Sequence, residues 1–217
     1  CIEDIYQNSF NIVEGKEWFK TDGKSVGGVI GGVIGVADMD ASVKFYGDFL
    51  GIKDVVYDVT GHFEDIPRSS EQEFRRVLLR KAKSPCGAFT NLLGEVEIEL
   101  VQRIQHRSKK IFENRYWGDC GFIHLCFDVT DMDTLKELSV SKGYNFTVDS
   151  QNSFSMDTAM GRFCYVEDPD GTLIELVETH KIPIVKKWSW HVDLRKRKNQ
   201  KPLPSWMIGL LGLNKVK

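Results

Sequence analysis

The chain contains an internal repeat, and this repeat limits the architectures into which it can fold. The segment Val36-Ala37-Asp38-Met39-Asp40 returns roughly ninety residues later as Val129-Thr130-Asp131-Met132-Asp133. Each copy follows an apolar run, opens a helical pattern that stops at a glycine, and later reaches a strand with the core Ile-Glu-Leu-Val. These strand cores are Ile98–Val101 and Ile174–Val177. Because this period is too long for a solenoid unit, we expect two duplicated modules, and the interface between such modules often holds a ligand.

Hydrophobic spacing predicts the order βαβββ within each copy. In the first copy we expect strands over residues 28–37, 53–60, 74–81 and 95–102, with a helix that is capped by Asp40 and ends at Gly51. In the second copy we expect strands over 122–129, 144–148, 161–166 and 172–178, with a helix over 132–142. The sequence Asp168-Pro169-Asp170-Gly171 predicts a hairpin turn, since proline fixes φ and glycine permits a positive φ.

The composition excludes several classes of protein. The chain has 217 residues, 41% hydrophobic and 28% charged, with a formal net charge of -2. These values are ordinary for a globular protein, and they favour neither a nucleic acid nor a membrane as partner. Since no apolar run approaches the ~20 residues that span a bilayer, and no signal peptide is visible, we expect a cytoplasmic protein by default. The spacing of the five cysteines predicts neither a zinc site nor disulfides, and Cys126 and Cys164 read as buried free thiols.

The ends of the chain differ from the repeated part. Residues 1–24 resemble the end of the second copy and are expected to be the tail of a preceding module, although a lipoprotein acylated at Cys1 and a chance acidic strand stay open. The first module is assigned to 25–105, a basic and aromatic linker to 106–120, the second module to 121–180, and a basic, aromatic C-terminal extension to 181–217. Because the whole chain is negative, we expect this extension to pack across the domain or onto a partner rather than bind nucleic acid.

Three side chains are candidates for chemistry. His124 lies in an apolar strand, and Glu99 and Glu175 occupy equivalent places in the last strands of the two copies. A glutamate that faces inward must be paired, hydrogen-bonded or bound to metal, because an uncompensated buried carboxylate costs several kcal/mol. Strand periodicity leaves open whether these glutamates face a cavity or solvent.

The motifs resemble the vicinal oxygen chelate superfamily, which includes glyoxalase, bleomycin-resistance proteins and extradiol dioxygenases. The resemblance covers roughly residues 25–180 and rests on the Asp-Met-Asp segments, on residues 122–131, and above all on residues 165–178. It implies an α+β fold in which paired βαβββ modules form a curled mixed sheet around a cavity. Such modules can also exchange between chains, so a homodimer is compatible with the sequence.

The resemblance also implies a divalent metal held by the first and last strands of both modules. Carried over by position, its ligands fall on His124, Glu175 and Glu99, whereas the fourth falls on Gly31, which has no ligating side chain. Water could fill that position, His62 on the longer loop of the first module could replace it, or the cavity could be free of metal. The metal would be zinc, nickel, manganese or iron(II).

The function that this resemblance implies is that of a metal-dependent isomerase, epimerase or lyase. The metal would polarise a chelated oxygen of a small substrate, and Glu99 or Glu175 would move the proton. The alternative is a metal-free protein that binds or sequesters a small molecule on the same fold. An extradiol dioxygenase is disfavoured, because Gly31 removes a histidine that such a site needs.

Overall fold

The two modules have the predicted order in a computed structural model of the chain, which describes all residues except 7, 16–18, 21–22, 24, 67–70, 107, 152–153, 157–158, 198–199 and 215–217. The first module runs through β3 (Gly31–Val36), α1 (Met39–Asp48), β4 (Asp54–Gly61), β5 (Phe74–Lys81), the short helix α2 (Thr90–Leu93) and β6 (Val96–Arg103). Its sheet has the strand order β3-β6-β5-β4, with β3 and β6 parallel and the other pairs antiparallel.

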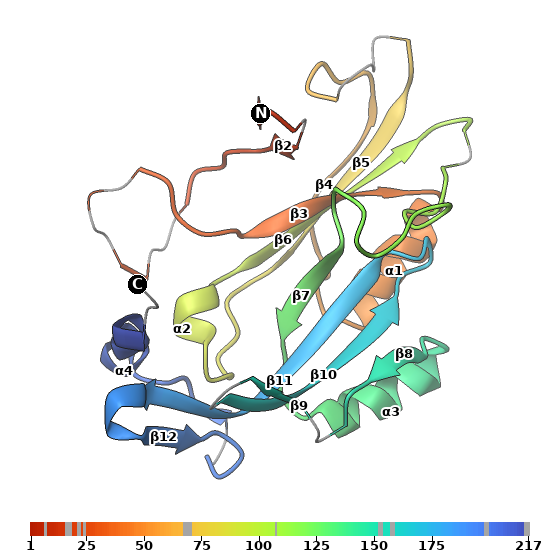
Figure 1. Cartoon of the computed structure of the whole chain (residues 1–217). Helices are drawn as coiled ribbons and strands as arrows, with labels where there is room; N and C mark the ends of the chain where they lie inside the picture. Colours follow the sequence, from red (N-terminus) through yellow and green to blue (C-terminus); the bar gives the residue numbers. More distant parts are fainter. Residues whose placement is uncertain are drawn as a thin grey trace.

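The second module repeats this topology (Figure 1). It runs through β7 (His124–Asp128), α3 (Met132–Lys142), β8 (Phe146–Asp149), β9 (Phe154–Met156), β10 (Ala159–Glu167) and β11 (Leu173–Val185). Strand β7 pairs with β11 in parallel, as β3 pairs with β6, and β10 lies between β11 and β8. The predicted βαβββ order is therefore confirmed, and α2 and β9 are additions that the sequence pattern did not reveal.

Both ends of the chain carry further elements. Near the N-terminus β1 (Ile2–Glu3) and β2 (Ser9–Phe10) form a small separate hairpin. Beyond the second module, β11 continues to Val185 and pairs with β12 (Trp190–Asp193). The helical turn η1 (Lys186–Trp188) joins these two strands, and α4 (Ser205–Leu210) and η3 (Leu211–Asn214) follow β12. No helix in the described ranges is long and apolar enough to cross a membrane.

Helix ends follow the local sequence. Asp38, rather than the predicted Asp40, caps α1, because its side chain accepts a hydrogen bond from the Ala41 amide at 3.0 Å. Asp40 lies inside the first turn, where its negative charge suits the helix dipole. Helix α3 has the predicted bounds and ends at Gly143, whose φ of 81° is the left-handed conformation that a helix C-terminus favours.

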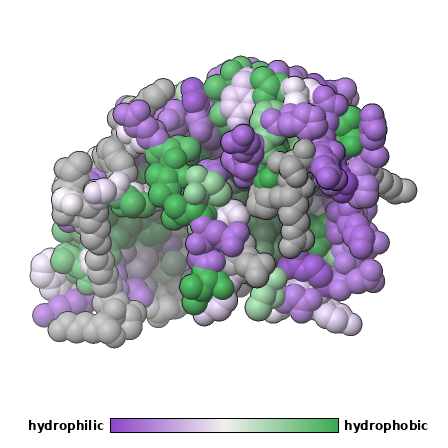
Figure 2. All heavy atoms as spheres, turned by 90° about the horizontal axis from the view of Figure 1, so that it is seen from above, coloured by the Kyte–Doolittle hydropathy of each residue, from purple (hydrophilic) through white to green (hydrophobic). Residues whose placement is uncertain are grey.

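The two modules share one hydrophobic core. Side chains from β3, β5, β6 and α1 pack in a single cluster with side chains from α3, β10 and β11, including Ile34, Phe45, Leu100, Met132 and Leu176. A second cluster lies under the C-terminal extension and joins Ile184, Leu203 and Ile208 to Ala88 beside α2. The extension is therefore packed onto the body of the protein. On one face of the molecule, Figure 2 shows apolar groups near the middle with hydrophilic groups flanking them.

Polar contacts fix how the modules meet. The predicted turn after β10 is clasped by the first module: the Tyr46 hydroxyl donates to Asp168 at 2.9 Å, and the Ala37 amide donates to Asp170 at 3.0 Å. Burial is the main cause that raises the pKa of Asp168 above its usual range. This turn therefore connects β10 to β11 and also links the second module to the first through hydrogen bonds.

Strand alternation gives each sheet a core face and an opposite face. In β6, Ile98 and Leu100 enter the core, so Glu97 and Glu99 lie on the other face. In β11, Ile174 and Leu176 enter the core, so Glu175 lies on the other face. We call this second face the inner face of each module, because it carries the side chains singled out from the sequence.

Candidate functional site

The two modules place their candidate residues in equivalent positions. Gly31 pairs with Glu97 across β3 and β6, and Glu99 lies two residues further along β6. His124 pairs with Leu173 across β7 and β11, and Glu175 lies two residues further along β11. Gly31 therefore corresponds in register to His124, and Glu99 corresponds to Glu175, as position counting in the sequence indicated.

Gly31 lies so close to the neighbouring strand that no side chain fits there. A Cβ atom built on Gly31 would overlap the backbone carbonyl oxygen of Glu97. By contrast, a Cβ atom at Gly35 in the same strand would meet nothing within 4 Å. The path of the backbone therefore prevents any side chain at this position from acting as a ligand. A substitution of Gly31 alone cannot supply one.

Glu99 is held by an ion pair. Its Oε1 atom accepts a hydrogen bond from Arg76 Nε at 2.5 Å and another from the Tyr57 hydroxyl at 2.6 Å. Both charged side chains are largely buried, with 12% of Arg76 and 8% of Glu99 exposed. Burial is the main cause that raises the pKa of Tyr57 well above its usual range, and the hydrogen bond to Glu99 adds to it. The carboxylate of Glu99 is therefore already neutralised by a cation of the protein.

The predicted loop of the first module covers this pair. Arg76 also binds Asp65 at 2.8 Å and lies over the ring of Phe63, with 4.9 Å from its guanidinium carbon to the ring centroid. His62 is exposed at the base of the same loop, just after β4, so it does not take the place that Gly31 leaves empty.

His124 and Glu175 do come together. His124 Nε2 lies 3.0 Å from Glu175 Oε2, with 26% and 18% of the two side chains exposed. The other ring nitrogen, Nδ1, is buried and has no hydrogen-bond partner among the described residues. If Nε2 carries the proton and donates it to Glu175, Nδ1 presents a free lone pair. A buried polar atom without a partner is uncommon and calls for a partner, which none of the described residues supplies.

Two further side chains surround Glu175. Tyr165 lies directly opposite Glu175 across the hairpin, and Cys126 pairs with Glu175 across β7 and β11. Desolvation first, and then the charge and hydrogen bond of Glu175, raise the pKa of Tyr165 to about 12. The same causes in the same order raise the pKa of Cys126 to about 12. Both groups are therefore protonated near neutral pH and can donate hydrogen bonds to the Glu175 carboxylate.

Cys126 corrects one expectation. Its side chain is exposed on the inner face instead of buried in the core, whereas Cys164 is buried as predicted. The reason is strand alternation, since Leu125 and Phe127 on either side of Cys126 take the positions against the core. The five cysteines are all free.

The linker supplies an aromatic wall to this site. The ring of Trp117 stacks over His124 with 5.5 Å between centroids, and meets the edge of Tyr165 at 5.5 Å. Phe112 also stacks on Trp117, with 6.5 Å between ring centroids. About half of Trp117 stays exposed, at 48%. The polar pair His124–Glu175 thus lies beside two aromatic rings, one of which belongs to a segment outside both sheets.

The proposed metal ligands do not converge. Within the part of the chain that the structure describes, no group of three His, Cys, Asp or Glu side chains is arranged to hold a metal ion. His124 and Glu175 are bonded to each other, and Glu99 is bonded to Arg76. A cation beside Glu99 would have to displace the guanidinium of Arg76, which already provides the positive charge. As they stand, these side chains do not fit the divalent metal that the resemblance implies.

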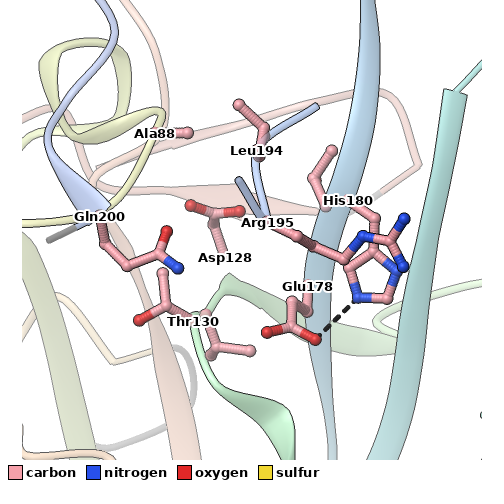
Figure 3. A pocket seen from close by; sticks show the side chains of 10 residues that line it. Ala88, Asp128, Thr130, Glu178, His180, Leu194, Arg195 and Gln200 are labelled. Atoms are coloured by element: carbon pink, nitrogen blue, oxygen red, sulfur yellow. Dashed lines mark hydrogen bonds and ion pairs between the residues drawn. The ribbon is translucent and has the colours of Figure 1, made fainter. Parts of the chain in front are cut away.

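Two cavities lie near the second module. One of about 270 Å³ is bounded by the linker residues Lys110, Phe112 and Glu113 and by Leu173, the partner of His124 in β7–β11 pairing. The other is only about 20 Å³ and lies where the C-terminal extension meets β7 and β11 (Figure 3). A cavity of that size holds about one water molecule, so it is too small for a substrate.

Figure 3 shows how the smaller cavity is closed. Asp128 and Glu178 face it from the module, and Gln200 faces it from the extension. Glu178 binds His180 at 2.8 Å. Burial first, and then the charge of Glu178, raise the pKa of Asp128 to about 7. This cavity therefore concerns how the extension docks and not the chemistry at Glu175.

The sequence itself matches a known family. A comparison with protein-family models assigns residues 30–176 to the Glyoxalase/Bleomycin resistance protein/Dioxygenase superfamily. The chain belongs to this superfamily. The match spans both modules and stops short of the C-terminal extension, and no curated protein matches the chain.

Comparison with solved structures shows what this chain is similar to. A glyoxalase family protein from Bacillus cereus is 16% identical, with a TM-score of 0.53 over 74% of this chain and 99% of that one. A glyoxalase/bleomycin resistance protein/dioxygenase domain from Frankia is 22% identical, with a TM-score of 0.47 over 71% and 93%. The trypanothione-dependent glyoxalase I of Leishmania major is 23% identical, with a TM-score of 0.45 over 69% and 84%. At these identities the first likeness shows the fold alone.

Sequence reasoning missed several residues of the site. Tyr165 had a usable signal, because a turn centred on Asp170 places residues 165 and 175 opposite each other. Arg76 had a weaker one, since a basic residue in β5 is a natural partner for an inward glutamate. Trp117 had none, because the path of the linker over the inner face follows from tertiary packing.

Proposed function

We propose that this protein binds a small organic molecule on the inner face of its second module and transfers a proton there without a metal ion. The observation that supports this most directly is the pair His124–Glu175, 3.0 Å apart beside Trp117 and Tyr165, with Nδ1 of His124 buried and unpartnered. A site that has a carboxylate, a histidine and aromatic walls suits a small substrate with an acidic C–H bond.

Each residue has a distinct role in this proposal. Glu175 is the general base and takes the proton from the substrate carbon. His124 holds Glu175 in place through Nε2, and Nδ1 accepts a hydrogen bond from a hydroxyl or amide of the ligand. Trp117 and Tyr165 hold the apolar or planar part of the ligand and exclude water, which strengthens the electrostatic interactions inside the site.

The first module has a structural role in this proposal. Since Gly31 leaves no ligand and Glu99 is paired with Arg76, two of the four positions that carry metal ligands in the resemblance are unavailable. The rival hypothesis is the metal-dependent isomerase or lyase in which His124, Glu99 and Glu175 hold zinc, nickel, manganese or iron(II). It requires that Arg76 move away from Glu99 when metal binds.

Solvent-exchange measurements test the proposal. The protein is incubated in D₂O with a panel of small carbonyl compounds, and NMR follows the loss of the signal of the proton next to the carbonyl. We expect exchange that persists after treatment with a chelator and falls by about 10²–10⁴ in Glu175→Gln, which keeps the shape of the side chain but is not a base. Glu137→Gln, an exposed carboxylate on α3, is the matched control.

Two results would contradict this proposal. Exchange that the chelator abolishes, together with one equivalent of metal by elemental analysis, would favour the metal-dependent rival. An exchange rate in Glu175→Gln that equals the rate in the unsubstituted protein would show that Glu175 does not take part in the reaction.

A further inference from the structure

The C-terminal extension presents a group of large apolar side chains to solvent. Trp188 is 72% exposed, Trp206 60% and Leu213 67%, and Trp190 is 38% exposed. Exposed tryptophans are uncommon on the surface of a folded protein, and a cluster of them marks a site of interaction. We call these four residues the tryptophan corner.

Contacts within the extension bring the tryptophan corner together. The rings of Trp190 on β12 and Trp206 on α4 stack with 6.3 Å between their centroids. The Asn214 side chain donates to the Pro183 and Ile184 carbonyls at 3.1 Å and accepts from the Lys186 amide at 2.9 Å. This ties the end of η3, beside Leu213, to η1, where Trp188 lies. Residues from four elements are therefore fixed in one place.

The elements that carry the tryptophan corner lie at one edge of the protein. Figure 1 shows β12 and α4 at the lower left, apart from the strands β4 and β5 and from α3. Neither of the two cavities described above is lined by any of its four residues. A peptide or a single-stranded nucleic acid usually binds in a groove, whereas an exposed group of apolar side chains outside any cavity suits insertion into a soft surface.

Charge is separated along the chain in a way that supports an anionic partner. Residues 181–217 contain ten of the 29 lysines and arginines but one of the 31 acidic residues, so they carry +9 while residues 1–180 carry -11. The single acid, Asp193, lies 3.6 Å from Arg195 and 3.7 Å from Lys196. Lys187, next to Trp188, is exposed. The overall charge of -2 conceals this strongly basic end.

We propose that the tryptophan corner docks on the surface of an anionic phospholipid bilayer. Tryptophan is enriched at the interface between lipid and water, where its ring is apolar and its N–H group is hydrated. Lysines and arginines beside it are attracted to anionic headgroups, and a stable peripheral attachment requires such a combination of apolar insertion and charge. The contact is peripheral, so it needs no membrane-spanning segment.

Sedimentation with lipid vesicles tests this proposal on the full chain. Vesicles of phosphatidylcholine alone are compared with vesicles of equal parts phosphatidylcholine and phosphatidylglycerol. We expect binding to the anionic vesicles only, weakened by added salt. We also expect the tryptophan fluorescence of the bound protein to shift to shorter wavelength.

Two sets of variants, each with its own control, separate the apolar and the charged contributions. Trp206→Ala is expected to weaken binding by about tenfold, since it removes one large inserted side chain, while Tyr6→Ala, an aromatic residue with 79% exposure elsewhere, is expected to have no effect. Lys187→Gln and Lys196→Gln are expected to weaken it about fivefold each, while Lys44→Gln on α1 is expected to leave it unchanged. Unaltered melting temperatures show that each variant folds.

Three outcomes would overturn the proposal. The first is no sedimentation with either kind of vesicle. The second is binding that persists at full strength in Trp206→Ala, Lys187→Gln and Lys196→Gln alike. The third is binding of a fluorescent single-stranded oligonucleotide that depends on Trp206 while the vesicles bind nothing, which would identify a nucleic-acid surface instead.

Discussion

The ion pair between Arg76 and Glu99 offers the sharpest test of how the first module works. The substitution Arg76→Met keeps an apolar stem of similar length but leaves the carboxylate of Glu99 without its cation. Because Arg76 is 12% and Glu99 8% exposed, the remaining charge is largely buried. Removing one partner of a buried pair costs about 3–5 kcal/mol of folding free energy. We expect a value near the lower end, about 3 kcal/mol, since Tyr57 still donates to Glu99.

The neighbouring residue provides a matched control. Arg75 is on the opposite face of β5 and binds Asp58 at 2.8 Å and Asp40 at 2.9 Å, but these carboxylates are 43% and 85% exposed. Arg75→Met should therefore cost less than about 1 kcal/mol. The double variant Arg76→Met/Glu99→Gln should recover most of the lost stability, because no buried charge is left uncompensated.

Urea denaturation and thermal unfolding measure these differences. A loss of about 3 kcal/mol corresponds to roughly 6–12 °C in melting temperature for a chain of this size. If Arg76→Met costs no more than Arg75→Met, the ion pair does not hold Glu99 and our account of the first module is wrong. Elemental analysis of Arg76→Met gives a second readout: one equivalent of metal that the parent protein lacks would show that Arg76 stands where a metal ion could bind.

Three further predictions concern the backbone, pH and a helix cap. Gly31→Ala should destabilise the protein by at least about 3 kcal/mol, whereas Gly35→Ala in the same strand should change it by less than about 1 kcal/mol, as urea denaturation would show. Asp128 has its pKa raised to about 7, so its protonated form is favoured by folding and stability should fall as pH rises from ~4 to ~7; Asp128→Asn should flatten this part of the curve and raise stability at pH 8, unlike Glu137→Gln. Asp38→Ala should cost about 1 kcal/mol through loss of the cap of α1, and an equal stability in both proteins would refute the cap.

The equivalent glutamates of the two modules lie in different surroundings. Glu175 lies next to His124 in a partly enclosed setting beside aromatic rings, whereas Glu99 is the partner of a guanidinium. The duplication thus leaves the two inner faces with different tasks. One faces a ligand in our proposal, and the other stabilises its sheet through paired charges.

Much of the architecture was determined by the sequence alone. The repeat of Asp-Met-Asp, the apolar periodicities and the Asp168–Gly171 turn are local signals, and they predicted the βαβββ order, the bounds of α3 and β5, and the equivalence of Gly31 with His124. Local signals work here because helix caps, turns and strand alternation depend on neighbours within a few residues.

The tertiary structure alone decided what these residues contact. The pairing of Glu99 with Arg76, the stacking of Trp117 over His124 and the docking of the C-terminal extension join parts of the chain that lie far apart in sequence. Strand periodicity states only which face a carboxylate occupies. Whether that carboxylate binds a metal, a ligand or a cation of the protein depends on which neighbouring strand, loop or linker packs against it, because its burial must be compensated by whatever the fold brings within hydrogen-bond distance.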